Sequence, residues 1–328
     1  MYRDALARAG KETVKTPLRF TDEVRDALRA RAPVVALEST IVTHGMPHPE
    51  NLETARAVEA AVRAEGALPA TIAVLEGEVT VGLDEAALEG LARSEGAMKL
   101  SRADLGIAVA RGVTGSTTVA ATMIVAKLAG IELFATGGIG GVHRGAEHSF
   151  DVSADLHELG RTAVTVVAAG AKAILDLPKT LELLESLGVP VIAYGQDVLP
   201  AFWSRDGGLA APLRMDTPAE LVAFLLARER LSLDGGVLVA NPVPAEHEIP
   251  GDEIDGYVER AVGEAEARGV RGKDVTPWLL ARIVELSDGR TLASNRALIV
   301  ANASLAARLA VALGEARGDD AYRNRSPL

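Results

Sequence analysis

The 328-residue chain contains no cysteine, which excludes disulfide bonds, thiolate metal sites and a cysteine nucleophile. Positive charge is in deficit, because 34 lysines and arginines face 45 aspartates and glutamates and leave a formal net charge of −11. A protein that binds the phosphate backbone of nucleic acids needs the opposite sign. Aromatic residues make up only 3% of the chain, too few for a surface on which bases stack. We therefore expect no nucleic-acid partner.

Long apolar segments are also missing. No run of 18 or more uninterrupted apolar residues occurs, so the sequence predicts no membrane span. Residues 1–10 lack the apolar core of a secretory signal. Together with the absence of cysteine, these features favour a cytoplasmic protein.

What the chain does contain is 48% hydrophobic residues, arranged as short apolar segments that alternate with helical patterns. This alternation predicts an α/β fold with a mainly parallel sheet covered on both faces. We expect strands at residues 34–37, 71–75, 78–81, 106–109, 133–136, 163–168, 189–194 and 236–240. We expect helices at residues 49–65, 84–94, 117–129, 154–159, 177–187, 218–230, 253–268, 276–287 and 294–314.

The same pattern predicts the domain organisation. Residues 1–20 look like a loose N-terminal arm, residues 21–314 like one catalytic domain, and residues 315–328 like a polar tail that frays. The region after residue 250 is almost entirely helical, so we expect a largely helical C-terminal region within that domain.

Lys172 stands in a weakly polar segment, residues 162–175, where a lysine is a poor choice for packing. Burial disfavours the charged ammonium, and a neutral amine attacks carbonyl carbons to form imines. The alternative is a lysine at a strand end with a buried stem and a hydrated head. From this segment alone, the alternative is favoured.

Ligands of open parallel sheets bind outside the carboxyl ends of the strands, and other strand ends here also carry unusual residues. Glu38 follows the expected strand at 34–37 and is either a general acid or a carboxylate that caps the turn at Ser39 and Thr40. Residues 112–118 (GVTGSTT) precede an apolar helix. They either bind an anion through backbone N–H groups or form an ordinary helix cap at Ser116 or Thr117, the simpler interpretation.

Glycines dominate the segment after the strand at 133–136, which reads GGIGG over residues 137–141 and lets the backbone approach a ligand closely. Charged and imidazole groups follow at once, so this segment is either a functional loop or a loop of solvated charges. A hard divalent cation uses one or two carboxylates and waters. The candidate groups here are His143, Arg144, His148, Asp151, Asp155 and His157. His44 and His48 have the spacing of a helical zinc site, but Gly45 and Pro47 break the helix.

Seven segments together carry a resemblance to a known family. They are residues 35–47 (VALESTIVTHGMP), 112–119 (GVTGSTTV), 135–145 (ATGGIGGVHRG), 150–156 (FDVSADL), 170–177 (GAKAILDL), 241–244 (NPVP) and 272–277 (GKDVTP). From about residue 21 to about residue 313, the chain resembles the pseudouridine-5'-phosphate glycosidases.

The resemblance implies an α/β/α sandwich, a trimer, and reversible cleavage of the carbon–carbon bond between uracil and ribose 5-phosphate with a divalent metal, usually Mn²⁺. It assigns Lys172 as the imine-forming nucleophile, Glu38 as the proton donor and Asp151 as the metal ligand. The substrate-binding positions that it implies are Lys99, Val119, His143, Ser153, Ala154, Asp155 and Asn295.

The 5'-phosphate of such a substrate needs cationic or N–H partners. The candidates are Lys99, Arg144 and the helix start at 115–118, which includes Thr117. Some relatives carry a fused sugar-kinase domain, for which this chain has no length, so a separate pseudouridine kinase is the expected pathway partner. Two other functions stay open. One is a different imine-forming lyase for sugar phosphates, such as an aldolase, and the other is a non-catalytic sensor of sugars or nucleotides.

Overall fold

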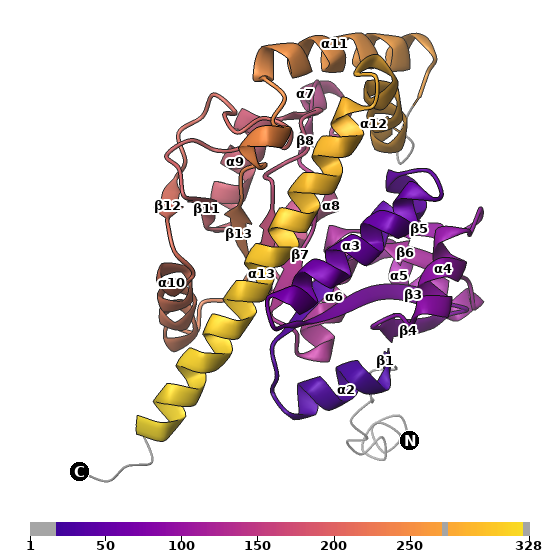
Figure 1. Cartoon of the computed structure of the whole chain (residues 1–328). Coiled ribbons are helices and arrows are strands. Elements are labelled where there is room, and N and C mark those ends of the chain that lie inside the picture. The colour runs from indigo at the N-terminus through magenta and orange to yellow at the C-terminus, as the bar shows by residue number, and fades with distance from the viewer. Residues whose placement is uncertain (1–17, 271–274, 324–328) are drawn as a thin grey trace, which may run out of the picture.

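A computed structural model describes residues 18–270 and 275–323 (Figure 1). Its largest sheet has eleven strands among these residues, nine of them in the order β1-β4-β3-β2-β7-β9-β13-β11-β12, with β6 beside β3 and β5 beside β6. The strands are β1 (Leu18–Phe20), β2 (Val34–Leu37), β3 (Leu68–Leu75), β4 (Glu78–Val81), β5 (Met98–Leu100), β6 (Gly115–Thr117), β7 (Leu133–Ala135), β9 (Thr165–Ala168), β11 (Val191–Tyr194), β12 (Leu213–Met215) and β13 (Val237–Ala240). A separate small antiparallel sheet pairs β8 (Val142–His143) with β10 (Leu175–Asp176).

The sheet is mainly parallel, as the sequence predicts. All neighbours from β3 through β2, β7, β9, β13 and β11 to β12 run parallel, whereas β4 and β6 run antiparallel to β3. Every residue of β2, β7, β9 and β13 is buried, which explains why these strands are continuous apolar runs without alternation. Consequently, the carboxyl ends of four neighbouring strands lie along one edge of the sheet.

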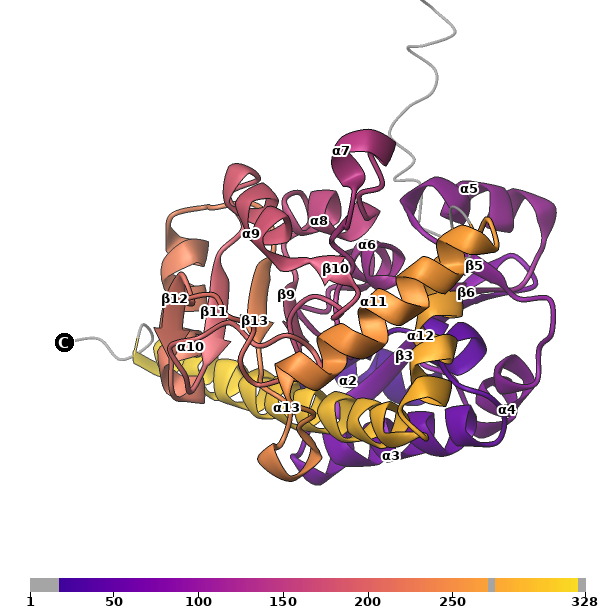
Figure 2. The same ribbon diagram turned by 90° about the horizontal axis from the view of Figure 1, so that it is seen from above.

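Helices cover both faces of this sheet (Figure 2). One layer contains α3 (Glu50–Ala64), α10 (Pro218–Arg230) and α13 (Arg290–Arg323). The opposite layer contains α5 (Arg102–Arg111), α6 (Val119–Ala129), α8 (Ala154–Leu159) and α9 (Leu177–Ser186). The predicted α/β/α sandwich is therefore confirmed.

Shorter helices lie around these layers, and two further helices cross one end of the sandwich. The short helices are α2 (Asp22–Arg29), the π-helical turn η1 (Ile41–Gly45), α4 (Glu85–Ala92), α7 (Ala146–Ser149) and the 3₁₀ turn η2 (Ala245–His247). The two that cross the end, at the top of Figure 1, are α11 (Gly251–Ala267) and α12 (Val275–Leu286). The region after residue 250 is thus largely helical, as predicted.

The long helix α13 runs diagonally across its face of the sheet and packs on α3, α10, β2, β7 and β9 (Figure 1). By length and composition alone, its segment Arg290–Gly318 is apolar enough to cross a membrane. However, 56% of an 18-residue apolar window within it is buried in the fold, as expected for a helix that supplies a face of the core. The apolar stretch of α13 is explained by this packing.

Four details of the predicted elements are wrong. Residues 106–109 belong to helix α5, not to a strand, because the pair Ser101 and Asp104 forms a capping box at its start and Gly112 ends it with a φ of 65°. The cap of α6 is the hydroxyl of Thr118, which accepts from the Ala121 N–H, and not Ser116 or Thr117. In the predicted arm, Leu18–Phe20 forms β1 beside β4, and in the predicted tail α13 continues to Arg323. Residues 1–17 and 324–328 lie outside the described residues.

Candidate active site

A cavity of about 410 Å³ lies at the carboxyl ends of β2, β7 and β9, and Thr276, Pro277 and Leu280 of α12 line it from the opposite side. This is the position that the parallel sheet predicts for a ligand. Nine of the predicted site residues line the cavity: Glu38, Lys99, Val119, His143, Asp151, Ser153, Ala154, Asp155 and Lys172.

Thr117, a predicted substrate-binding residue, does not line the cavity. It is fully buried in β6, where its hydroxyl donates to the Ile72 carbonyl oxygen at 2.7 Å and its N–H donates to the Ser39 hydroxyl at 2.9 Å. Thr117 therefore joins β6 to β3 and to the turn after β2. Its neighbour Thr118 lines the cavity instead.

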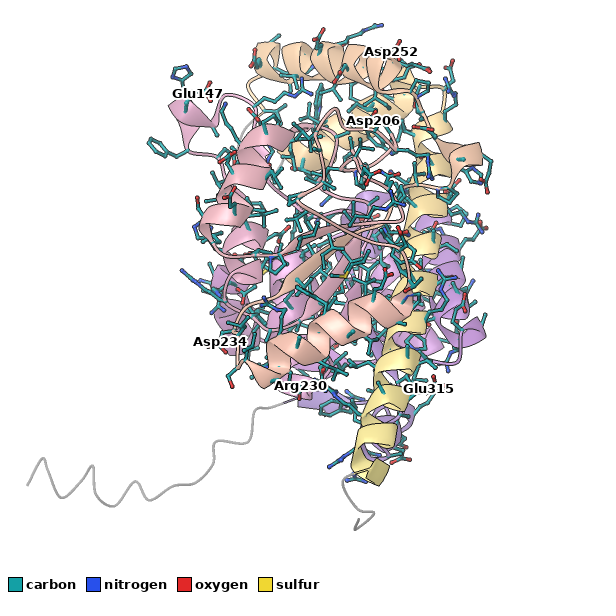
Figure 3. All side chains as sticks on the ribbon, turned by 90° about the vertical axis from the view of Figure 1, so that its left-hand side faces the viewer. Glu147, Asp206, Arg230, Asp234, Asp252 and Glu315 are labelled. Atoms are coloured by element: carbon teal, nitrogen blue, oxygen red, sulfur yellow. The ribbon has the colours of Figure 1, made fainter. Side chains whose placement is uncertain are left out.

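Asn295 and Arg144 are also outside the cavity. The Asn295 side-chain oxygen accepts from the indole N–H of Trp203 at 2.7 Å, and Trp203 packs against Phe202, which does line the cavity. Arg144 forms an ion pair with Asp255 at 3.4 Å and lines a separate surface depression. Figure 3 shows the side chains of that acidic surface, on which Glu147, Asp206 and Asp252 are labelled. Arg144 is thus not placed to bind a phosphate in the cavity.

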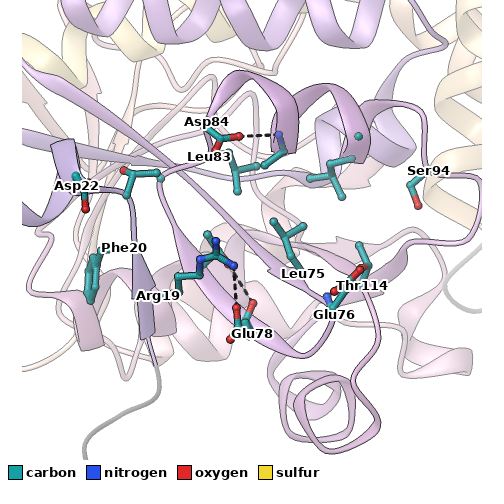
Figure 4. A pocket seen from close by; sticks show the side chains of 16 residues that line it. Arg19, Phe20, Asp22, Leu75, Glu76, Glu78, Leu83, Asp84, Ser94 and Thr114 are labelled. Carbon is teal, nitrogen blue, oxygen red and sulfur yellow. Dashed lines mark hydrogen bonds and ion pairs between the residues drawn. The ribbon is translucent and has the colours of Figure 1, made fainter.

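A larger depression of about 950 Å³ beside β1 and β4 contains none of the predicted site residues among its described lining (Figure 4). Its charged groups hold the fold together. Arg19 donates to Glu78 at 2.9 Å across the β1–β4 pair, and the Asp84 carboxylate caps α4 through the Ala87 N–H at 2.8 Å.

Glu38 follows β2 directly, and only 8% of it is exposed. One carboxylate oxygen accepts from the hydroxyl of Thr40, in the next turn, and the other accepts from the hydroxyl of Thr136, directly after the neighbouring strand β7. Glu38 therefore bonds the turn after β2, as the structural alternative predicts, and it also lines the cavity, where a general acid would have to lie. The two hydroxyls fix the direction of the carboxylate.

Lys172 follows β9, the strand next to β7. Its N–H donates to the Ile139 carbonyl oxygen at 3.1 Å, and its own carbonyl oxygen accepts from the Leu175 N–H at 3.0 Å. Gly170, with a φ of 85°, supplies the turn that leaves the strand, and its oxygen accepts from the Ile139 N–H at 3.1 Å. The Lys172 backbone is thus fastened to the glycine-rich loop, and its half-buried side chain lines the cavity.

The glycine-rich loop, residues 137–141, has little room for side chains because neighbouring groups approach its backbone closely. A Cβ on Gly140 would lie 2.2 Å from the Ser153 hydroxyl oxygen and 2.8 Å from a carboxylate oxygen of Asp155. A Cβ on Gly138 would lie 2.7 Å from the ring of Phe202. The dense glycines therefore allow this loop to pack against other cavity residues.

Asp155 was predicted to bind substrate, but both of its carboxylate oxygens bond the protein backbone. One accepts from the Ala120 N–H at the start of α6 at 2.9 Å, and the other accepts from the Gly140 N–H at 2.8 Å. Asp155 is only 6% exposed. The helix start that the sequence suggested as an anion site thus already holds a carboxylate of the protein.

Two histidines of the cavity sit among positive charges. Burial lowers the pKa of His44 below its usual range, and the charge of Lys99 lowers it further. Burial likewise lowers the pKa of His143; the Asp151 carboxylate raises it, and Lys172 and Lys99 both lower it. The cavity therefore combines two lysine side chains with imidazoles whose environment favours the neutral form.

Sequence reasoning missed several cavity residues, and His44 is the most informative of them. His44 belongs to η1, a π-helical turn, and such turns are frequent at functional sites. The spacing of His44 and His48 does not indicate such a site, because an α-helical metal pattern does not describe a π-helical turn. Ser101, Phe202, Thr276 and Leu280 were missed because their elements reach the cavity only through tertiary packing. Residues 272–274 of the seventh motif lie outside the described residues.

The described cavity residues offer a divalent cation few protein ligands. Within residues 18–270 and 275–318, no group of three or more His, Asp or Glu side chains is arranged to hold a metal. Both oxygens of Asp155 accept from backbone N–H groups, which leaves Asp151 as the other aspartate of the cavity lining. These residues fit a hard cation held by one carboxylate, with waters and substrate oxygens completing its shell.

The fold and the cavity define the class: an α/β/α sandwich whose main cavity, at the carboxyl ends of neighbouring parallel strands, is lined by a lysine and a buried glutamate. The chain belongs to the family described as Indigoidine synthase A like protein, whose model matches residues 23–312.

Among its relatives are curated pseudouridine-5'-phosphate glycosidases, which confirms the resemblance. The chain is 66% identical to that of Paracoccus denitrificans (strain Pd 1222) over 296 residues, which cover 90% of this chain and 97% of the relative. It is 63% identical to that of Jannaschia sp. (strain CCS1) over 297 residues, which cover 90% and 98%.

Two solved structures share the fold over nearly the whole chain. The prealnumycin C-glycosynthase AlnA, in complex with ribulose 5-phosphate, has a TM-score of 0.86 and 36% identity, over 93% of this chain and 99% of that one. An indigoidine synthase A-like protein from Thermotoga maritima has a TM-score of 0.84 and 37% identity, over 92% and 97%.

Proposed function

We propose that this protein cleaves the carbon–carbon glycosidic bond of pseudouridine 5'-phosphate reversibly, giving uracil and ribose 5-phosphate, through an imine on Lys172. The relatives that are 66% and 63% identical over 90% of this chain are named for this substrate. The observation that carries the proposal is that Lys172 and Glu38, which lie far apart in the sequence, line the same cavity at the carboxyl edge of the sheet.

An amine suits this reaction because the leaving atom is carbon. An ordinary nucleoside breaks at a carbon–nitrogen bond whose nitrogen accepts a proton readily, but a C-nucleoside offers no such atom. The sugar ring must open, and C1' must gain electron density as uracil departs. The Lys172 amine attacks C1', displaces the ring oxygen and forms a C1'–N bond. When C5 gains a proton, the C1'–C5 bond breaks with its electron pair remaining on uracil, and the nitrogen lone pair forms the imine at C1', which water hydrolyses to ribose 5-phosphate.

We propose that Glu38 transfers the protons in these reaction steps. Its carboxyl group donates to the ring oxygen as the sugar opens and takes the proton back later. Thr40 and Thr136 hold the carboxylate in one direction, which keeps a mobile proton at a fixed place. The scheme of two carboxylates used by ordinary glycosidases is not required.

Mn²⁺, or Mg²⁺ or another divalent cation in its place, is the proposed metal, and Asp151 is its proposed ligand. Bound there, such an ion orders water and the phosphate of the substrate. Asp151 is held for this role through its backbone, since its carbonyl oxygen accepts from the His143 N–H at 3.0 Å.

The remaining expectations are proposals of the same kind. We propose a homotrimer, a cytoplasmic location and a separate kinase that forms the 5'-phosphate. The trimer is supported by the family resemblance. A neighbouring subunit would also cover Phe150, which precedes Asp151 and is 87% exposed in the single chain. The absence of cysteine supports a reducing compartment.

Borohydride reduction in the presence of ribose 5-phosphate tests the imine. The wild-type protein should acquire a reduced sugar adduct on Lys172, found by peptide mass mapping, and Lys172→Ala should acquire none and release no uracil. Lys127→Ala, on the exposed last turn of α6, is the matched control and should behave as wild type. Uracil release that persists undiminished in Lys172→Ala contradicts the assignment of the nucleophile.

The runner-up function, an aldolase-like lyase for sugar phosphates, keeps the lysine but needs no uracil pocket. Uracil release from pseudouridine 5'-phosphate with added Mn²⁺ separates the two. An adduct on Lys172 without uracil release favours the lyase, and the absence of any adduct favours a non-catalytic sensor.

A further inference from the structure

His44 is a cavity residue to which neither the sequence motifs nor the proposed mechanism gives a task. One ring nitrogen, Nδ1, lies 2.5 Å from the Thr43 hydroxyl oxygen and 3.4 Å from that of Ser116. The Thr43 hydroxyl in turn donates to the Ser116 oxygen at 2.6 Å. The protein therefore holds Nδ1, and Nε2 is the ring nitrogen left for a ligand in the cavity.

This chain of bonds fixes the tautomer of His44. A hydroxyl group has one hydrogen, and the hydrogen of Thr43 is directed to Ser116. The short contact between Thr43 and His44 can then be a hydrogen bond only if Nδ1 carries a hydrogen and donates it. In the neutral ring the other nitrogen, Nε2, is then an acceptor.

Lys99 lies close to this acceptor. Lys99 of β5 is directly opposite Ser116 of β6, so the strand that carries Lys99 is tied to the group that orients His44. The positive charge of Lys99 and the burial of the ring both lower the pKa of His44, which keeps Nε2 an acceptor. An unprotonated Nε2 accepts a hydrogen bond from an N–H or O–H group of a ligand and has no hydrogen to donate to a phosphate oxygen.

We propose that Nε2 of His44 accepts a hydrogen bond from a ring N–H of the pyrimidine base, so that His44 and Lys99 together read the alternating N–H and C=O groups of the uracil edge. The proposal rests on the proposed function and deepens it. It places the base at the η1 and β5 side of the cavity, and it makes His44 a specificity residue instead of a metal ligand or a phosphate partner.

The chemistry of the substrate gives this contact a purpose. In a C-nucleoside both ring nitrogens carry hydrogen, because the sugar is bonded to carbon. In an N-nucleoside the nitrogen that bears the sugar has none. A fixed acceptor at the base therefore favours a ligand with a complete set of N–H donors, and a site that leaves a buried acceptor unpaired rejects a ligand without them.

Kinetics in the direction of synthesis test the proposal, because uracil and ribose 5-phosphate are then separate substrates. In full-length His44→Phe, the KM for uracil should rise about 5- to 100-fold, the range for one buried hydrogen bond left unmade, while the KM for ribose 5-phosphate stays within about twofold. His44→Gln, which restores an amide oxygen near the Nε2 position, should recover part of the uracil affinity. Reductive trapping of ribose 5-phosphate on Lys172 needs no base and should be unchanged in both variants.

Each other outcome overturns the proposal. An increased KM for ribose 5-phosphate with an unchanged KM for uracil assigns His44 to the sugar phosphate, and an unchanged pair of values assigns it no contact. Loss of trapping in a folded variant assigns it to the imine site. If His44→Phe does not fold, wild type and His44→Gln are compared with 1-methyluracil and 3-methyluracil as inhibitors. If neither methyl group weakens inhibition of the wild type, the proposal is overturned. Failure of wild-type trapping would instead refute the proposed function itself.

Discussion

Asp155 offers the sharpest test of how this site is assembled. Its carboxylate joins the first turn of α6 to the glycine-rich loop by accepting the Ala120 and Gly140 N–H groups at 2.9 and 2.8 Å. A hydrogen bond to a charged group contributes about 1.5–3 kcal/mol. Because the residue is only 6% exposed, water cannot easily replace it, and Asp155→Ala should lower the free energy of unfolding by about 3–6 kcal/mol.

The measurement is urea denaturation followed by circular dichroism, with Asp155→Asn beside Asp155→Ala. The asparagine variant keeps one carbonyl oxygen as an acceptor and should lose roughly half as much stability. Asp234→Asn, at an exposed position labelled in Figure 3, is the control and should stay within about 0.5 kcal/mol of wild type. If Asp155→Ala unfolds within about 1 kcal/mol of wild type but has lost uracil release, the residue serves the substrate and our reasoning is refuted.

Three further substitutions test other contacts. Gly140→Ala should cost about 1–3 kcal/mol in urea denaturation and abolish uracil release, because its Cβ would lie 2.2 Å from the Ser153 hydroxyl; a variant of wild-type stability would contradict the packing of the loop. Thr136→Val should slow uracil release about 10- to 100-fold with its backbone bonds intact, since Glu38 loses one of two hydroxyl donors; an unchanged rate would show that Thr136 does not position it. Burial raises the pKa of Glu59, so the wild type loses stability as pH rises through that pKa. Glu59→Gln should therefore have a higher melting temperature than wild type at pH 8 but not at pH 4. Equal increases in melting temperature at both pH values would exclude this cause.

The strands that build the centre of the sheet were predictable because each is a buried apolar run of at least three residues with a helix on either side. Residues 34–37 have the predicted bounds, and so does β4 at 78–81, which lies outside the centre. The strands β5, β6, β8, β10 and β12 have two or three residues each, too few for a pattern, and only pairing with distant segments creates them. The segment 106–109 shows the opposite error, since an apolar run alone does not reveal that caps at both ends make it helical.

The candidate site residues could be predicted where they follow the ends of parallel strands. Glu38, the glycine-rich loop and Lys172 each come directly after a strand of the parallel sheet, so topology brings them together. Two things were beyond the sequence. Which carboxylate faces ligand and which bonds the backbone depends on atomic contacts, as Asp155 shows. The contribution of α12 depends on a helix that begins about a hundred residues after Lys172 and folds back over the cavity.

The position of α13 has a consequence for how the protein is made. This helix packs on β2, β7 and β9, yet it follows every strand of the sheet in the chain. While a ribosome is still adding residues 290–323, β2, β7 and β9 lack the one helix of their layer that packs directly on all three of them. Their exposed aliphatic surface is then open to self-association and to chaperones. A nascent chain arrested just before residue 290 should therefore be far more prone to aggregate than one released after α13 has emerged.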